Sequence, residues 1–140
     1  MARRRGSHEV LWDDGPEAFS FLVDSWRFEG PELVAEGLEY RRADLVVTVR
    51  TWTWNGEAGF TTSLRCVPGS VGASYASLDC LYVACRLGPL QDVPTGASAS
   101  RVVIKRIKQH AVALGAVLPH LEGAQAVDLF RRCQGRQIPR

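Results

Sequence analysis

Residues 45–66 read LVVTVRTWTWNGEAGFTTSLRC and predict a β-hairpin. Asn55-Gly56 lies at its centre, and both central residues of a type I′ turn need a positive φ, which Asn and Gly tolerate best. β-Branched and aromatic residues, which favour strands, flank this turn on both sides. A two-residue turn gives the cross-strand pairs Thr51 with Phe60, Val49 with Thr62, Val47 with Leu64, and Leu45 with Cys66. These pairs form one mostly apolar face.

The segment GLEYRRAD, residues 37–44, predicts a third strand in front of the hairpin. A two-residue turn within RRAD sets Tyr40 opposite Leu45 and Leu38 opposite Val47, again on the apolar face. Both turns thus give one register with one buried face. We expect an α+β fold: a three-stranded antiparallel meander packed on one face by an N-terminal helix and C-terminal helices.

Helical spacing of apolar residues predicts the helices around this meander. The first has Pro16 in its first turn and stops at Gly30-Pro31. PELVAEG, residues 31–37, fits either a short helical turn or the start of a strand. The predicted helices lie within residues 13–31, 74–88, 98–123 and 123–136. One shared core is expected to contain Phe19, Leu22, Trp26, Val47, Leu64 and Leu114.

The 140 residues suit one domain. We expect a flexible basic N-terminal arm over residues 1–14, a single α+β domain over 15–135 and a C-terminal tail over 136–140. No apolar run approaches the roughly 20 residues that span a bilayer, and no secretory signal follows the basic start. A cytoplasmic protein without a membrane partner is therefore expected. The stretch PGSVGAS, residues 68–74, is expected to be a plain loop.

Charge is balanced overall but uneven along the chain. Seventeen basic and 15 acidic residues leave a net charge of +2, which argues against a general phosphate binder. Arg101, Lys105 and Lys108 recur at helical spacing and form a basic stripe. This stripe is either the solvated face of an amphipathic helix or a docking site for nucleic acid or an acidic protein. Because no nucleic-acid-binding motif accompanies it, a nucleic-acid partner is not expected.

No catalytic or metal-binding pattern is present, so neither an enzyme nor a cofactor is expected. The histidines lack the spacing of a zinc site, and Cys80 with His110 is a pairing that any fold could present. The four cysteines, Cys66, Cys80, Cys85 and Cys133, are expected to be reduced and buried. The alternatives are a disulfide pair or a reactive thiol.

The tryptophans of the hairpin raise the main functional question. Pairing across Asn55-Gly56 puts Arg50, Trp52, Trp54 and Arg65 on the face opposite the apolar one. A terminal segment or another strand could cover the indoles, and Trp52 could itself cover Gly59 across the strands. Otherwise the four residues form a partner-binding surface, since Trp and Arg are enriched at protein interfaces. Stacking on bases or sugars is the third reading.

The order of segments resembles a group of small bacterial cytosolic proteins, some encoded beside polymorphic toxins as immunity-type proteins. The similar segments are AFSFLVDSWRF, LEYRRADLVVTVR, the hairpin, SLDCLYVACRLG and a C-terminal HAVALGAVLPHLEG followed by DLFRR. The resemblance covers most of the chain but consists mainly of core periodicity. It implies a binding protein without catalysis, and it transfers no site residues.

We therefore expect a small cytosolic protein-interaction protein, such as an immunity-type inhibitor that binds a toxin or another protein. The main alternative is a small enzyme or ligand-binding domain with a pocket between the sheet and the helices. A nucleic-acid-binding module is the third possibility. A flat aromatic and charged surface would favour the first reading, and a deep pocket with convergent polar groups would favour the second.

Overall fold

The computed structural model describes residues 6–66, 75–122 and 125–134. These residues form an antiparallel sheet whose strands follow one another in sequence order, β1-β2-β3-β4-β5. The strands are β1 (Glu29–Val34), β2 (Gly37–Arg41), β3 (Leu45–Trp54), β4 (Glu57–Cys66) and β5 (Tyr75–Ser77). The helices are α1 (Ser7–Ala18), α2 (Ser20–Trp26), α3 (Leu78–Ala84), α4 (Ser100–Val117) and α5 (Gln125–Gln134), with short 3₁₀ turns η1 (Leu90–Asp92) and η2 (Leu118–Leu121). The α+β class is confirmed, and the sheet has more strands than the expected three-stranded meander.

The hairpin of β3 and β4 has the predicted register. Val47 pairs with Leu64, and both side chains are fully buried. Asn55 and Gly56 adopt φ values of 56° and 84°, as the central residues of a type I′ turn require. This turn therefore decides which residues of β3 and β4 face the core and which face away from it.

The predicted register between β2 and β3 is wrong by two residues. Tyr40 pairs with Val47 and Leu38 with Val49, whereas Leu45 and Val47 were the expected partners. The turn is centred one residue later in the chain than predicted. A shift of two residues keeps every side chain on its face, so the apolar face was predicted correctly although the partners were not.

Arg42 explains the position of this turn. Its backbone N–H donates to the carbonyl oxygen of Leu45 at 2.8 Å, which leaves the two residues between them at the turn centre. Its Nε and Nη2 donate to Asp44 Oδ1 and Oδ2 at 2.6 and 3.1 Å, and the Arg42 hydrogen bond lowers the pKa of Asp44. Nη1 donates to the carbonyl oxygen of Trp26 at 3.0 Å, and Nη2 reaches Glu122 at 3.4 Å. One arginine thus joins the turn to α2 and to the segment after η2.

Strands β1 and β5 flank the meander and were not predicted. β1 starts at Glu29 and extends into residues 31–37, for which the sequence fitted either a helical turn or the start of a strand. All of its residues except the last are exposed. β5 has three residues, of which Ala76 pairs with Leu64 of β4, and it is too short for alternation to be visible in the sequence. The loop expected over residues 68–74 lies outside the described residues.

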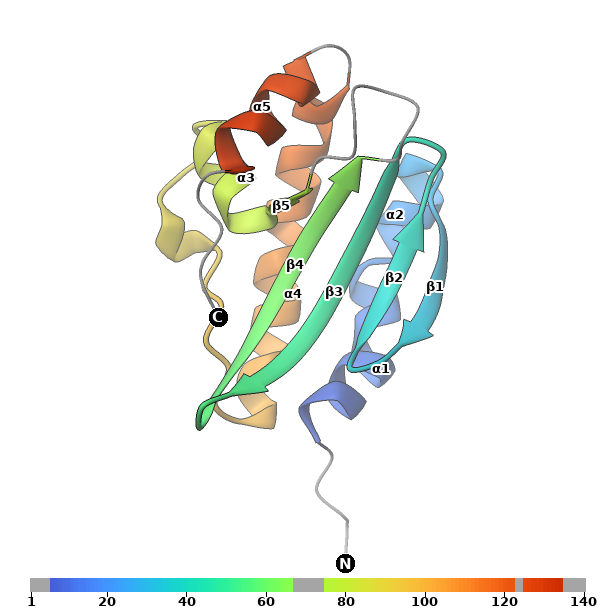
Figure 1. Cartoon of the computed structure of the whole chain (residues 1–140). Helices are drawn as coiled ribbons and strands as arrows, with labels where there is room; N and C mark the ends of the chain where they lie inside the picture. The colour runs from blue at the N-terminus through green and yellow to red at the C-terminus, as the bar shows by residue number, and fades with distance from the viewer. Residues whose placement is uncertain (1–5, 67–74, 123–124, 135–140) are drawn as a thin grey trace, which may run out of the picture.

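The helices lie on one side of the sheet. Figure 1 shows α1, α2 and α4 behind the strands, while the face turned toward the viewer carries no helix. The predicted core forms between these two layers, except that Trp26 is only partly buried at its edge. The fully buried members are Phe19, Leu22, Val47, Leu64 and Leu114. One-sided covering of the sheet, expected from the sequence, is therefore present in the described residues.

The N-terminal helix begins earlier than expected. Residues 1–14 were predicted to be an arm outside the domain, but α1 starts at Ser7, and Val10 and Leu11 belong to the core. Trp12 fixes this helix to the sheet, because its Nε1–H donates to the carbonyl oxygen of Gly37 at 2.9 Å. Pro16, predicted to be in a first turn, lies inside α1 and close to its end. Residues 1–5 and 136–140 lie outside the described part.

The apolar stripe of α4 faces the core, and it includes Leu114 as predicted. Val103, Ile107 and Leu114 are buried, whereas Ala111 is only half-buried and its neighbour His110 takes a core position. On α2, Leu22 is buried but the next residue, Val23, is 41% exposed. Helical spacing thus identified the inward faces but not every residue at their margins.

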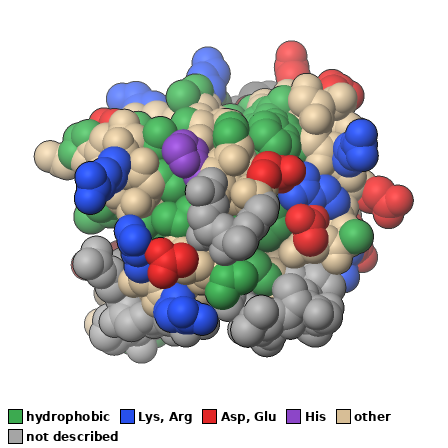
Figure 2. All heavy atoms as spheres, turned by 90° about the horizontal axis from the view of Figure 1, so that it is seen from above, with side chains coloured by type: hydrophobic (Ala, Val, Ile, Leu, Met, Phe, Trp, Pro, Cys, Tyr) green, Lys and Arg blue, Asp and Glu red, His purple; other side chains and the backbone are tan. Residues whose placement is uncertain are grey.

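The unequal distribution of charge along the sequence does not make the face seen from above in Figure 2 uniformly charged. Figure 2 shows acidic and basic side chains next to one another, between hydrophobic ones, in the view from above. Among the described residues, no helix has both the length and the apolar character needed to cross a membrane.

Candidate functional site

A hollow follows β3 and β4 on the face of the sheet that carries no helix. We call it the sheet-face groove. Its volume is about 440 Å³, and it runs along the strands from the paired Thr48 and Ser63 to Trp54, beside the hairpin turn. The residues that line it are Thr48, Arg50, Trp52, Thr53, Trp54, Thr61, Ser63 and Tyr75. Three of the four predicted surface residues, Arg50, Trp52 and Trp54, therefore lie together, and Arg65 lies two residues beyond Ser63 on β4.

Trp52 is held in place at the floor of the groove. Its indole lies against Gly59, its partner on β4, so closely that a Cβ atom at Gly59 would collide with the ring. Its Nε1–H donates to Thr61 Oγ1 at 2.8 Å. The predicted covering of a cross-strand glycine by an aromatic ring is thus present. Because the ring is fixed before any ligand arrives, it offers a surface with little conformational entropy left to lose.

Trp54 is the more exposed of the two indoles. Its side chain is 54% exposed, and no described element covers it. Arg50 and Arg65 are also exposed, and neither forms an ion pair within the described residues. The arginines that do form ion pairs there are Arg41, Arg42 and Arg132. On the open face, the exposed indole of Trp54 therefore lies between the fixed indole of Trp52 and the turn. The positive charges of Arg50 and Arg65 are nearby, and no carboxylate of the described residues forms an ion pair with them.

Tyr75 and the hydroxyl groups of the groove were not predicted to be part of the site. Tyr75 is 44% exposed and reaches the groove from β5, a strand that the sequence did not reveal. Thr48, Thr61 and Ser63 line the groove together with Trp52. Their shared face with Trp52 was the signal that could have identified them.

The basic stripe lies on a different part of the molecule. Arg101, Lys105 and Lys108 are all exposed on α4, whose opposite side packs into the core beneath the sheet. The helical layer and the sheet separate them from the groove, so the structure does not bring the two candidate surfaces together. Within the described residues, none of the three cations forms an ion pair, and their role as a docking site stays a hypothesis.

His110 is buried in the core with both ring nitrogens occupied. Nε2 lies 2.8 Å from the carbonyl oxygen of Pro94, and Nδ1 lies 2.9 Å from Thr62 Oγ1. A carbonyl can only accept, so Nε2 carries the proton and Nδ1 accepts from the threonine hydroxyl. Burial lowers the pKa of His110 to about 4. His110 therefore does not pair with Cys80, and its contacts hold α4 against β4 and the loop before α4.

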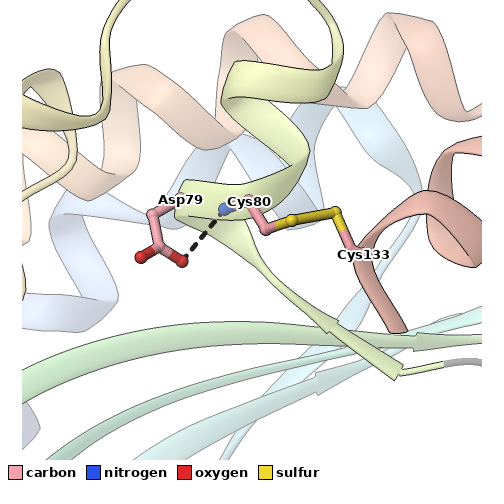
Figure 3. The surroundings of a disulfide bond; sticks show 3 residues. All are labelled: Asp79, Cys80 and Cys133. Carbon is pink, nitrogen blue, oxygen red and sulfur yellow. Dashed lines mark hydrogen bonds between the residues drawn. A yellow bond between two sulfur atoms is a disulfide. The ribbon is translucent and has the colours of Figure 1, made fainter. Parts of the chain in front are cut away.

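Cys80 and Cys133 form a disulfide bond, which contradicts the prediction that all four cysteines are reduced thiols. Figure 3 shows the bond joining α3 to α5, with the Asp79 carboxylate accepting from the backbone N–H of Cys80 at 3.0 Å. The two residues are 53 positions apart in sequence, and their Cα atoms lie 5.9 Å apart. Only the packing of α3 beside α5 brings them together, so the sequence alone could not identify the pair. Cys66 and Cys85 are free and half-buried, and burial raises the pKa of both thiols.

In the part of the chain that the structure describes, no three side chains of the metal-ligating types gather at one place. Two further hollows lie beside helices, one between Tyr82 and Val112 and one over the disulfide. No family model, curated protein or solved structure matches this chain.

Proposed function

We propose that the protein binds a protein partner and that the sheet-face groove is the contact surface. The observation that carries this proposal is the 54% exposure of Trp54 beside the fixed indole of Trp52. A large exposed aromatic patch is unfavourable in water unless a partner covers it. Trp, Tyr and Arg, all present in this groove, are the residues most enriched at binding hot spots.

Two alternatives have less support. An enzyme or a ligand-binding domain was expected to have its pocket between the sheet and the helices, and that space holds packed side chains such as Leu38, Val47 and Leu64. A nucleic-acid-binding surface needs several cations along a phosphate backbone, whereas Arg50 is the only cation among the described residues that line the groove.

The role of an immunity-type inhibitor and a cytoplasmic location belong to the same proposal. The role rests on the resemblance of the helix and strand pattern, which implies a toxin or another protein as partner. The location places a condition on the Cys80–Cys133 bond, because cytosolic reductants keep most thiols reduced. In the cytoplasm, Cys80 and Cys133 would therefore remain reduced thiols until an oxidant joins them.

Selection of peptide ligands tests the proposed surface without knowledge of the natural partner. A random nonapeptide library is displayed on phage and selected on the immobilised protein, and the enriched peptides are synthesised. We expect their affinity for Trp54→Ala to fall about 30-fold or more, which corresponds to the roughly 2 kcal/mol of a hot spot. Because Trp54 is exposed, the variant should stay as stable as the wild type within about 1 kcal/mol.

Val112→Ser is the matched control, since Val112 is 75% exposed and lies on α4, away from the groove. It should leave the affinity of the same peptides unchanged. Peptides that bind Trp54→Ala as well as the wild type would contradict the proposal. A large loss of stability in Trp54→Ala would contradict it as well, because the indole would then belong to a second core.

A further inference from the structure

We infer that the groove accepts an extended peptide segment in which apolar side chains lie two and four positions away from a carboxylate side chain, on either side of it in sequence. This inference rests on the proposed function and adds the chemistry of the segment. Arg50 would bind the carboxylate, and Trp52 and Trp54 would contact the apolar side chains.

The spacing of the groove residues matches an extended ligand. Arg50, Trp52 and Trp54 are alternate residues of one strand, so their positions repeat every roughly 6.8 Å, twice the rise per residue. The side chains on one side of an extended peptide repeat at the same interval. A carboxylate at one position therefore reaches Arg50 while the residues two and four positions away reach the indoles, with the peptide in either direction.

The hydroxyl groups distinguish an extended ligand from a helical one. Thr61 Oγ1 accepts from the Trp52 indole, which leaves its own proton free to be donated, and the Ser63 side chain has no hydrogen bond within the described residues. An extended peptide presents backbone N–H and C=O groups to such hydroxyls, whereas a helix uses these groups internally. The polar floor of the groove thus suits an exposed backbone.

The charges of the open face favour a ligand with a negative charge at Arg50. Arg50 lies in the groove, and no carboxylate of the described residues pairs with it. Glu39 also faces this side, but its Oε1 accepts from Arg41 at 2.6 Å, and this pairing reduces its effect. Glu57 lies opposite Trp54 at the turn, away from Arg50. One carboxylate placed at Arg50 would therefore meet an uncompensated cation, while a second one near Trp54 would meet Glu57 and be repelled.

A single arginine favours a peptide over a nucleic acid. Affinity for single strands comes from several phosphate contacts together with base stacking, and the described lining of the groove offers stacking surfaces with one cation. A carboxylate and a guanidinium form a charge-assisted and often bidentate pair, for which one arginine is sufficient.

The same peptide selection, carried out in parallel on three proteins, tests this inference. The wild type should enrich Asp or Glu at one position and apolar residues two and four positions away. On Arg50→Gln the acidic preference should disappear while the apolar preference remains. Lys105→Gln, which removes an exposed cation outside the groove, should behave as the wild type. For a synthesised peptide, Glu→Gln should weaken binding about tenfold to the wild type and less than about twofold to Arg50→Gln.

The outcomes separate this inference from the proposed function. Trp54-dependent peptides that lack an acidic preference, or that keep it on Arg50→Gln, would overturn the inference and leave the proposed function standing. Apolar residues at helical spacing would also overturn it. Peptides that do not depend on Trp54 would overturn both. A fluorescent oligo-dT of 12 nucleotides that binds more tightly than any selected peptide, in a manner that depends on Arg50, would assign the groove to nucleic acid instead.

Discussion

The indole of Trp52 occupies the space that a side chain at Gly59 would need. The two residues are paired across β3 and β4, and a Cβ atom at Gly59 would meet both the ring and, at 2.7 Å, the carbonyl oxygen of Thr95. The loop at Thr95 is itself joined to β4, since the N–H of Phe60 donates to that oxygen at 2.8 Å. Gly59 is therefore confined between the groove and this loop.

Gly59→Ala should displace Trp52 and disturb the groove. Because neither the ring nor the Thr95 backbone can move freely, we expect a loss of about 1–3 kcal/mol in the free energy of unfolding. The affinity for groove-dependent peptides should fall in the same variant. Denaturant titration measures the first effect. Gly96→Ala is the control, because a Cβ there meets nothing within 4 Å. Equal stability of the two variants would disprove the close packing of Trp52 on Gly59.

Leu64→Ala tests the core and the hairpin register together. Leu64 is fully buried opposite Val47, and removing a buried leucine side chain costs about 2–5 kcal/mol. A denaturant titration of this variant should show a loss within that range. Arg65→Ala, one residue later on the opposite face, should cost less than about 1 kcal/mol. If the two losses were exchanged, the register of β4 would be wrong.

Because of His110, we expect the free energy of unfolding to decrease in acid. Its pKa is about 4 in the folded protein and about 6.5 in an unfolded chain. Between these values the unfolded chain binds a proton that the folded protein does not, so stability falls as the pH decreases. The contribution of His110 is complete above pH 6.5 and should decrease by about 3 kcal/mol as the pH falls to 4.

The pH dependence of His110 is best isolated by comparison with His110→Gln. Both proteins contain the same carboxylates, so the difference between their unfolding free energies removes most other titrations. That difference should change steadily between pH 6.5 and 4. If it stays constant over this interval, burial does not lower the pKa of the His110 ring.

The Cys80–Cys133 bond predicts a difference between oxidised and reduced protein. A bond that closes 53 residues stabilises a protein by about 4 kcal/mol if the unfolded chain is restricted only by loop entropy. Unfolding in the presence and absence of a dithiol reductant should show a loss of this order. Cys80→Ala should lose the dependence on reductant, and Cys85→Ala should keep it. Alkylation of the protein inside its host cell, followed by mass measurement, would show whether Cys80 and Cys133 are reduced thiols there, as the proposed cytoplasmic location implies.

The local parts of the fold could be predicted because single residues decide them. Asn55-Gly56 fixes one hairpin, and with it the separation of Val47 from Trp52 on opposite faces. Helical spacing placed Leu114 in the core for another local reason, because the buried side of a helix repeats along the sequence.

The parts that the sequence did not reveal depend on contacts between distant segments. The turn at Arg42 is set by contacts with Trp26 and Glu122, which are distant from it in sequence. The disulfide depends on the packing of α3 beside α5. Tyr75 reaches the groove only because a three-residue strand adds to β4, and three residues are too few to show an alternating pattern. The sequence therefore predicted the groove residues Arg50, Trp52 and Trp54 of β3 but not Tyr75 of β5.

The indole N–H signals of the four tryptophans give the most direct test that the sheet-face groove is the binding surface. An NMR titration with a selected peptide reports on all four at once, and Trp12 and Trp26 lie on the helical side as internal references. We predict that the signals of Trp52 and Trp54 shift on peptide binding and that those of Trp12 and Trp26 do not. Binding that shifts Trp12 or Trp26 while Trp52 and Trp54 stay unchanged would contradict the proposed function.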